Sequence, residues 1–207
     1  MSRNSQLGFN NRANLLQENM NLFHDTGICL LTLICVFVII IGGYLFFSKL
    51  SHRNLRDHQF LETIWTAFPA LLLIGLAIPS LSLLYESDQK SSAFRVLKRT
   101  GHQWYWDYSQ PGFNSSTDIY IIKRVSRCLE VDNRPVLNVG ESYNIRTTRA
   151  DVIHAWALPS LAVKIDSVPG RINSSVSSID LPGLFYGQCR EICGANHSFM
   201  PVVLEVV

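Results

Sequence analysis

The chain has 207 residues, enough for one or two domains, and a formal net charge of +2. Residues 85–207 carry 13 Lys and Arg against 12 Asp and Glu, so no strong basic field indicates a nucleic-acid partner. The five cysteines do not suggest a disulfide framework. Cys29 and Cys35 lie in an apolar run, Cys128 is expected to be a buried thiol, and only Cys189 and Cys193 lie beside other metal-binding side chains.

Two apolar segments dominate the first half of the chain. Residues 27–47 and 63–84 contain no charged side chain, and each is long enough to cross a bilayer, which takes about 20 residues in a helix. A buried core helix is the alternative for one such segment, but two of them in a short chain favour a membrane. The sequence therefore predicts a transmembrane hairpin over residues 27–84, with helices at about 27–47 and 62–84.

The polar segments around these helices predict their orientation. Residues 1–26 form a polar tail that does not resemble a removable signal, because the apolar run that follows is too long. The loop between the helices carries Lys49, Arg53 and Arg56 against Asp57, and basic loops stay on the inner side of a membrane. We expect the tail and residues 85–207 on the outer side, although Lys and Arg residues also follow the second helix.

Residues 85–207 form the second predicted domain, which has an ordinary single-domain size. Short β-rich runs alternate there with clusters of Gly, Pro, Asn and Ser, a pattern typical of a sandwich or barrel. The predicted strands lie at residues 118–122, 129–131, 142–147, 151–157, 161–165 and 201–207. No long helix is expected after residue 84.

The last loop of the chain gathers four side chains that bind soft metals. Cys189, Cys193, His197 and Met200 supply two thiolates, an imidazole and a thioether within twelve residues. Such ligands favour copper over calcium or magnesium, and a blue-copper site needs one Cys, two His and a weak Met. The additional cysteine permits a dinuclear site in which both sulfurs bridge two copper ions. Together with the short strands, these ligands predict a membrane-anchored all-β protein with a cupredoxin-like Greek-key β-barrel.

A further strong ligand has to come from a distant strand. His154 is the best candidate. A lone histidine in a strand is usually structural, but here the copper loop needs a second imidazole, which favours a ligand role. His102 is the competitor, although the aromatic residues around it suggest another role. Two alternatives remain for the loop itself. A disulfide between Cys189 and Cys193 would close a very small ring, and a zinc site would leave Met200 unused.

Together these features resemble the subunit 2 family of cytochrome c oxidase over nearly the entire chain. The run from Cys189 to Met200 looks like the dinuclear copper loop of that family. Further motifs occur in the family's order on a two-helix anchor: residues 61–66 (LETIWT), 101–106 (GHQWYW), 130–134 (EVDNR), 151–156 (DVIHAW) and 166–171 (DSVPGR). Each of these motifs by itself is moderately specific for the family, whereas the complete set in this order is highly specific.

The resemblance implies two kinds of metal site. Two copper ions are held by two bridging cysteines, one histidine for each copper, a weak thioether and a backbone carbonyl: Cys189 and Cys193, His154 and His197, Met200, and Glu191. The side chain of Glu191 binds a magnesium ion shared with the catalytic subunit. This division agrees with the preference of magnesium for carboxylate and of copper for thiolate and imidazole.

Residues outside the metal loop acquire roles through the same resemblance. The resemblance implies that Trp104 passes electrons from cytochrome c to copper. The residues alone would instead indicate packing in a core or at a membrane interface. Asp132 and Asp151 match acidic docking positions, whereas Ala150 stands where an acid is common. Glu62 opens the second membrane helix and is a candidate for proton uptake, the alternative being an interfacial carboxylate.

The function implied is electron transfer within a terminal oxidase. The subunit takes electrons from reduced cytochrome c and passes them to haem in the catalytic subunit 1, where oxygen is reduced to water with proton translocation. Its expected partners are subunit 1, the other oxidase subunits, cytochrome c and the lipid bilayer, and no nucleic acid.

The expected location is the mitochondrial inner membrane, with the tail (1–26) and the copper domain (85–207) in the intermembrane space and the helix loop in the matrix. A bacterial plasma membrane is the alternative. Three other functions are a membrane-anchored copper chaperone, a quinol-oxidase subunit of the same fold and a structural anchor without metal. The two predicted helices, the β-rich domain and the complete ligand set argue against them.

Overall fold

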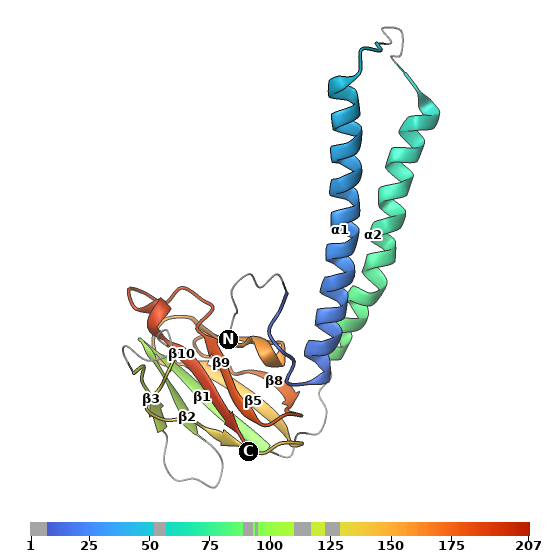
Figure 1. Cartoon of the computed structure of the whole chain (residues 1–207). Helices are drawn as coiled ribbons and strands as arrows, with labels where there is room; N and C mark the ends of the chain where they lie inside the picture. The colour runs from blue at the N-terminus through green and yellow to red at the C-terminus, as the bar shows by residue number, and fades with distance from the viewer. Residues whose placement is uncertain (1–7, 52–56, 89–92, 94, 110–116, 123–128) are drawn as a thin grey trace. The chain divides into compact units, whose positions relative to one another are not determined.

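The computed structural model describes residues 8–51, 57–88, 93, 95–109, 117–122 and 129–207. The chain divides into a helical unit, Met20–Glu86, and a mostly β unit that combines Met1–Asn19 with Ser87–Val207 (Figure 1). Two apolar helices followed by an all-β domain agree with the expected fold class. Cys128, Arg53 and Arg56, which entered the sequence predictions, lie outside the described residues.

Both helices begin earlier than their apolar runs. α1 spans Leu15–Phe47 and α2 spans Gln59–Asp88. The side chain of Asn14 accepts a hydrogen bond from the backbone nitrogen of Gln17 at 2.9 Å, which is the contact expected of an N-cap residue. The imidazole of His58 accepts one from the nitrogen of Leu61 at 3.2 Å in the same way. The polar first turns are therefore helical because they are capped, which hydrophobicity alone does not reveal.

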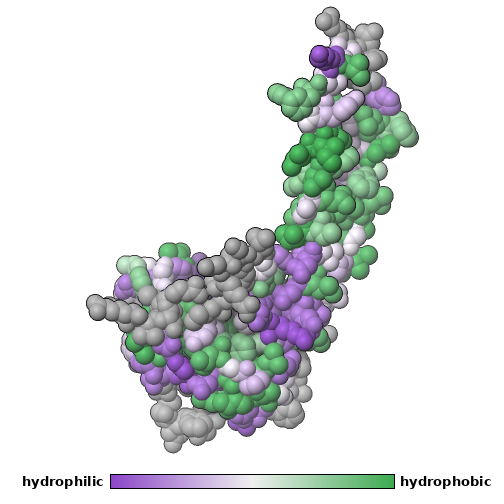
Figure 2. All heavy atoms as spheres, viewed as in Figure 1, coloured by the Kyte–Doolittle hydropathy of each residue, from purple (hydrophilic) through white to green (hydrophobic). Residues whose placement is uncertain are grey.

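The helices expose nearly all of their apolar side chains. Both are long and apolar enough to cross a membrane, and Figure 2 shows hydrophobic residues along most of their length. Hydroxyl groups in them donate back to carbonyls four residues earlier, so they require no outside partner: Thr26, Thr32, Thr63 and Thr66. Pro69 and Pro79 lie inside α2, where membrane helices tolerate proline.

The described residues of the β unit form three sheets. A five-stranded sheet has the order β3-β2-β1-β5-β8, a three-stranded sheet the order β4-β10-β9, and β6 pairs with β7. β6 contacts strands of both larger sheets, and β7 contacts β5 and β8 of the five-stranded sheet. The strand bounds are β1 Arg95–His102, β2 Tyr105–Ser109, β3 Thr117–Ile119, β4 Val136–Leu137, β5 Ser142–Arg149, β6 His154–Leu158, β7 Val163–Ser167, β8 Asn173–Ser178, β9 Gly183–Gln188 and β10 Pro201–Val206.

The core lies among these sheets. Alternating side chains of β1 and β5 are buried, as expected when one face of a strand packs inward, whereas β6 is buried along its whole length. The largest fully buried apolar side chains come mostly from the strands and from η2 (Pro159–Leu161): Trp106, Trp156, Leu97, Ile119, Leu137, Ile145, Leu158, Leu161, Ile179, Met200 and Leu204. The metal ligands predicted from the sequence thus border a complete core.

The residues before α1 are part of this β unit. Ala13 is fully buried, its nitrogen donates to the carbonyl of Ser160 at 2.9 Å, and its carbonyl accepts from the nitrogen of Asp180 at 2.9 Å. The amide of Asn14 donates to the carbonyl of Leu161 at 3.0 Å. What the sequence suggested as a separate polar tail is therefore tied to the β domain near residue 13.

Several strands differ from their predicted positions. β3 ends at Ile119, and residues 129–131 contribute only an isolated bridge between Ile121 and Val131. β1, β2, β4, β8 and β9 were not predicted. β8 has the sequence NSSVSS, which reads as a turn, yet it pairs with β5 along its whole length. Tertiary pairing here overrides local propensity.

Candidate metal centre

The loop between β9 and β10 carries four of the predicted ligands. The two strands are antiparallel, and Gln188 and Pro201 form their last pair. One more hydrogen bond, from the nitrogen of Cys189 to the carbonyl of Met200 at 3.0 Å, closes the base of the loop. The short 3-10 helix η3, His197–Phe199, brings the chain back toward β10. Residues far apart along the loop are thus held at one end of the sheet.

The first half of the loop is fixed from the side by residues that follow β1. The side chains of Gln103 and Trp104 both donate to the carbonyl of Cys193, at 2.9 and 3.2 Å. Gly194 has a φ of +119°, and a Cβ there would lie 3.1 Å from the indole of Trp104. The backbone conformation at residue 194 therefore favours glycine, and the tryptophan leaves little room for a Cβ.

His154 reaches the loop from the start of β6 and is fully buried. Its Nε2 lies 2.8 Å from a carboxylate oxygen of Asp151, and its ring packs edge-on against Trp106 with the centroids 5.8 Å apart. A Cβ on Gly101 would lie 2.8 Å from the imidazole. The ring is therefore enclosed on several sides, with Nδ1 directed to the sulfur of Cys189 at 3.9 Å.

Four donor atoms meet in this place. The ligand atoms of His154, Cys189 and Cys193 lie within 4.8 Å of one another. The two sulfurs are 4.0 Å apart, and Nδ1 of His197 lies 3.4 Å from the sulfur of Cys193. The Cys189 sulfur is also 3.4 Å from the carbonyl oxygen of Glu191. Both cysteines are free thiols, so the disulfide alternative does not describe this structure.

The chemistry of this donor set fits copper. Two soft sulfurs and two imidazoles converge, the side chain of Met200 is fully buried in the adjoining core, and both cysteines are buried. Thiolate and imidazole together suit Cu and Zn, and a thioether adds preference for copper. The buried surroundings and the fixed imidazole are the features that tune a metal of this kind.

Comparison with known proteins agrees with this geometry. A family model described as cytochrome c oxidase subunit II, periplasmic domain, matches residues 95–207, and the transmembrane-domain model of the same subunit matches residues 2–83. The chain belongs to the cytochrome c oxidase subunit II family. Cytochrome c oxidase subunit 2 of Albinaria turrita is 50% identical over 100% of this chain and 96% of that protein. The Drosophila melanogaster protein is 45% identical over 100% of this chain and 94% of that protein.

Solved structures of subunit II resemble the β unit. The periplasmic domain from Bradyrhizobium japonicum matches with a TM-score of 0.55 and 42% identity, covering 57% of this chain and 88% of that one. A mixed disulfide between a thioredoxin-like protein and subunit II of cytochrome c oxidase matches with a TM-score of 0.51 and 41% identity, covering 58% and 86%. The predicted fold, a membrane anchor with a cupredoxin-like domain, is confirmed, and the chain is a subunit of an oxidase.

Burial and neighbouring charges separate the two thiols of this subunit II site. Burial raises the pKa of Cys189, but hydrogen bonding to His154 and to backbone groups outweighs it and lowers the pKa to about 7. At Cys193, burial and then the charge of Cys189 raise the pKa to about 12. Burial also lowers the pKa of His154, but its contacts with Cys189 and Asp151 leave it above the usual value. A metal bound by both sulfurs therefore has to displace the more tightly held proton of Cys193.

The two predicted docking carboxylates have internal partners. Asp151 accepts hydrogen bonds from the nitrogens of Gln103 and Val152, both at 2.6 Å, in addition to its contact with His154. Asp132 accepts from the nitrogens of Tyr120 and Asn133, both at 2.8 Å. Both residues remain exposed. Asp151 thus joins the turn before β2 to His154, a predicted metal ligand, which its predicted docking position did not suggest.

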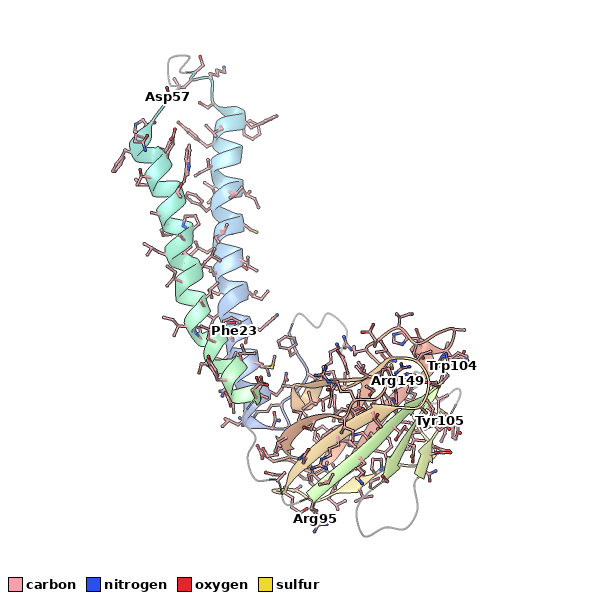
Figure 3. The ribbon with its side chains drawn as sticks, turned by 180° about the vertical axis from the view of Figure 1, so that it is seen from behind. Phe23, Asp57, Arg95, Trp104, Tyr105 and Arg149 are labelled. Carbon is pink, nitrogen blue, oxygen red and sulfur yellow. The ribbon has the colours of Figure 1, made fainter. Side chains whose placement is uncertain are left out.

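The aromatic motif divides between the metal loop and a separate stack. Trp104 and Tyr105 lie at one end of the β unit (Figure 3). Trp104 contacts the loop, whereas His102, the competing ligand, stacks on Tyr105 with their rings 4.7 Å apart. Tyr105 stacks in turn on Tyr120 at 4.6 Å. His102 is therefore engaged in ring stacking, while His154 supplies the second imidazole near the sulfurs.

The two predicted glutamates differ in their relation to the sulfur cluster. Glu191 brings its backbone carbonyl to Cys189, and its side chain is half-buried. Glu62 lies in the first turn of α2, where its nitrogen bonds to the carbonyl of His58 at 3.0 Å. It belongs to the helical unit and not to the metal centre.

Sequence inspection missed the residues that hold the site in place. Gly101 and Gln103 were noticed only as letters of an aromatic motif, yet one touches the His154 ring and the other fixes the loop. Arg190 donates its backbone nitrogen to the carbonyl of Ala155 at 3.0 Å, which joins the loop to β6. Backbone contacts of this kind leave no signature in residue type, although a glycine three residues before the first tryptophan of the aromatic cluster is a usable hint.

Proposed function

We propose that this chain is the electron-accepting subunit of a cytochrome c oxidase. It takes electrons singly from reduced cytochrome c and passes them to haem in the catalytic subunit, where oxygen is reduced to water and protons are translocated. The observation that carries the proposal is the convergence of His154, Cys189 and Cys193 within 4.8 Å, beside His197. Membership of the subunit II family supports the same assignment.

Two copper ions would be held by this donor set. Cys189, Cys193, His154 and His197 would be the strong ligands, and two weak ligands would add to them: the Met200 thioether and the Glu191 carbonyl. When bound, the metal pair supplies a one-electron acceptor whose change in charge is spread over two metals and two sulfurs. Zinc remains the rival for the same thiolates and imidazoles.

The protein contributes a ligand frame that resists rearrangement. Asp151 fixes the orientation of His154 through Nε2, and Gln103 and Trp104 fix the carbonyl of Cys193. Outer contacts of this kind orient the ligands and set their basicity. Electron transfer is fast when the ligands move little on reduction, so the frame serves the reaction by keeping the donor atoms in place.

Trp104 is proposed as the point at which electrons reach the centre. Its indole nitrogen is 3.2 Å from the carbonyl of Cys193, a residue whose sulfur is a bridging ligand. The side chain is only half-buried, so one part faces outward while another touches the ligand loop. This combination provides a short covalent and hydrogen-bonded route from the surface to the sulfur.

Cytochrome c is proposed to dock on the same end of the domain. Asp132 and Asp151 are exposed acids on it, and their internal hydrogen bonds hold the carboxylates without removing their negative charge. The basic partner would be steered by this charge, and the association should weaken as salt is added. The Trp104 indole would then lie at the contact.

The remaining roles rest on the family and the chain's composition. Glu191 is proposed to bind, through its side chain, a magnesium ion shared with the catalytic subunit, and Glu62 to take part in proton uptake. The animal relatives support the mitochondrial inner membrane, with the β unit in the intermembrane space and the helix loop in the matrix. A bacterial plasma membrane is the alternative location.

Electron paramagnetic resonance of the copper-loaded full chain in detergent tests the proposal. Hyperfine splitting by two equivalent copper nuclei, at two coppers per chain, is expected. Splitting by one nucleus at one copper per chain would refute the dinuclear assignment and favour a chaperone or blue-copper function. Preferential zinc retention without a copper signal would favour a structural site. Cys29→Ser, which changes an exposed cysteine in α1, is the matched control and should leave the signal unchanged.

A further inference from the structure

Arg99 is a cation enclosed in the core of the β domain. It lies on β1, and 1% of it is exposed. Its guanidinium carbon lies 3.3 Å from the centre of the Trp156 ring. None of its three side-chain nitrogens has a hydrogen-bond partner among the described residues. Buried arginines are usually paired, so a stacked but unpaired guanidinium requires an explanation.

Among the residues that the structure describes, no anionic side chain pairs with Arg99. Burial lowers its pKa to about 9, which keeps the group protonated at neutral pH, and the nearby Tyr108 acts in the opposite direction. Tyr108 faces it across the strand pair and accepts a hydrogen bond from the Trp156 indole at 2.9 Å. Burial raises the pKa of Tyr108 to about 12, so the phenol is neutral. A positive charge is thus held among neutral aromatic groups.

Two strands place this charge near the metal ligands. Gly101 is two residues beyond Arg99 on β1 and lies against the imidazole of His154. Trp156 is two residues beyond His154 on β6. Residues two apart on a strand lie on the same face and are separated by about 7 Å. Arg99 and Trp156, which stack on each other, are therefore each two residues along a strand from Gly101 and His154, where the ligand ring lies.

We propose that Arg99 is a positioning charge that raises the reduction potential of the metal centre. The inference rests on the proposed function, since it needs a redox metal in the site. Reduction adds one electron to the centre, with no bond formed or broken, so the net positive charge of the centre falls by one. A nearby cation repels the oxidised form more than the reduced form. The stacked guanidinium therefore makes the centre a better electron acceptor.

Simple electrostatics sets the expected size. Two unit charges about 10 Å apart in a protein of effective dielectric constant about 20 change an equilibrium by about tenfold. For one electron, a tenfold change corresponds to about 59 mV. Salt should not remove the effect, because buried charges are screened far less than exposed ones.

The test compares Arg99→Met with Lys98→Met in the copper-loaded full chain. Lys98 is the adjacent residue on β1 and is exposed, so its removal subtracts the same charge from a solvated position. We expect Arg99→Met to lower the midpoint potential by about 59 mV, the equivalent of tenfold, at both low and high salt. Lys98→Met should leave it close to the original value. Equal potentials for the two variants would overturn the proposal.

Further measurements keep the result interpretable. The paramagnetic spectrum and copper content of Arg99→Met should match the parent, which separates a change in charge from a rearranged site. If that variant does not fold, Arg99→Gln, which keeps a polar side chain, takes its place with the same expected shift. A parent chain without a two-copper signal would defeat the proposed function itself. An intact signal with an unshifted potential would defeat only the role of Arg99.

Discussion

The helical unit and the β unit use apolar residues in opposite ways. In α1 and α2 the apolar side chains are exposed, and a Cβ added to Gly27, Gly42, Gly43 or Gly75 would meet nothing within 4 Å. In the β unit, an added Cβ at Gly187 would lie 1.9 Å from the carbonyl oxygen of Ala157. One unit is closely packed by its own residues, whereas the other exposes apolar surface of the kind that a bilayer covers.

This difference shows where the chain can specify a rigid site. A ligand frame needs side chains whose positions are fixed by packing, and only the β unit provides such positions without outside help. The helices supply anchoring and candidate groups for contact with other subunits. Substitutions matched between the two units should therefore have unequal consequences.

The largest difference is expected between the two kinds of cysteine. Cys189→Ser removes a sulfur that we propose to bridge the metals and should reduce oxidase activity by on the order of 100-fold or more, since even the loss of outer contacts costs 10- to 100-fold. Cys35→Ser changes an exposed cysteine of α1 and should be nearly silent. Copper content and turnover of the assembled oxidase measure both. A two-copper centre retained by Cys189→Ser would contradict the ligand assignment.

Matched glycines test the packing contrast directly. Gly187→Ala forces a methyl group against the backbone of Ala157 and should lower the free energy of unfolding by about 3 kcal/mol. Gly75→Ala meets open space in α2 and favours the helix, so the isolated chain should be equally or slightly more stable. Denaturant unfolding followed by tryptophan fluorescence gives the comparison. Equal effects at both sites would show that the two units do not differ in packing.

A carboxylate in the helical unit should affect turnover without affecting the metal. Glu62→Gln is expected to slow steady-state oxygen consumption severalfold, because a neutral amide cannot carry a proton. Rapid-mixing reduction of the copper centre by cytochrome c should keep its rate. Glu18→Gln, in the first turn of α1, serves as the control. Unchanged oxygen consumption in Glu62→Gln would remove the residue from the proton route.

The smallest effect concerns pH and the β unit. The pKa of Glu141 is lowered, first by its hydrogen bond from Tyr143, then by Asn138, with Arg95 also contributing. Because the pKa of Glu141 is lower in the folded state, its ionised side chain stabilises the fold fully above the unfolded-state pKa, near 4.5. This stabilisation is lost as the pH falls through the folded-state pKa. Glu141→Gln should therefore unfold slightly earlier at pH 7 than the parent, and the gap should close in acid. Thermal unfolding of both proteins, followed by the circular dichroism of the β unit at pH 7 and in acid, provides the check.

The metal ligands could be predicted because their chemistry is concentrated in a short run. Cys189, Cys193, His197 and Met200 combine residue types that few structural loops contain, and they create the need for a distant imidazole. His154 met that need, and the structure brings it to the sulfurs. The roles of Trp104, Glu62 and the docking acids came from resemblance and stay predictions.

The supporting structure was less visible in the sequence. The starts of α1 and α2 depend on the caps at Asn14 and His58, which hydropathy does not register. β8 is made largely of serine and becomes a strand only by pairing with β5. Arg99 was counted as an ordinary charge after the second helix, because nothing in the letters around it indicates that the fold would enclose it.

The two hydrogen bonds of Ala13 have a topological consequence. Its nitrogen and carbonyl join Ser160 and Asp180, so the chain starts its excursion through α1 and α2 from the same domain to which it returns. A bilayer can be crossed only an even number of times between two points on one side. A chain in which only one helix had inserted would leave Ala13 and its partners separated by the membrane. The β domain can therefore close around residue 13 only when the chain between them has crossed the bilayer an even number of times.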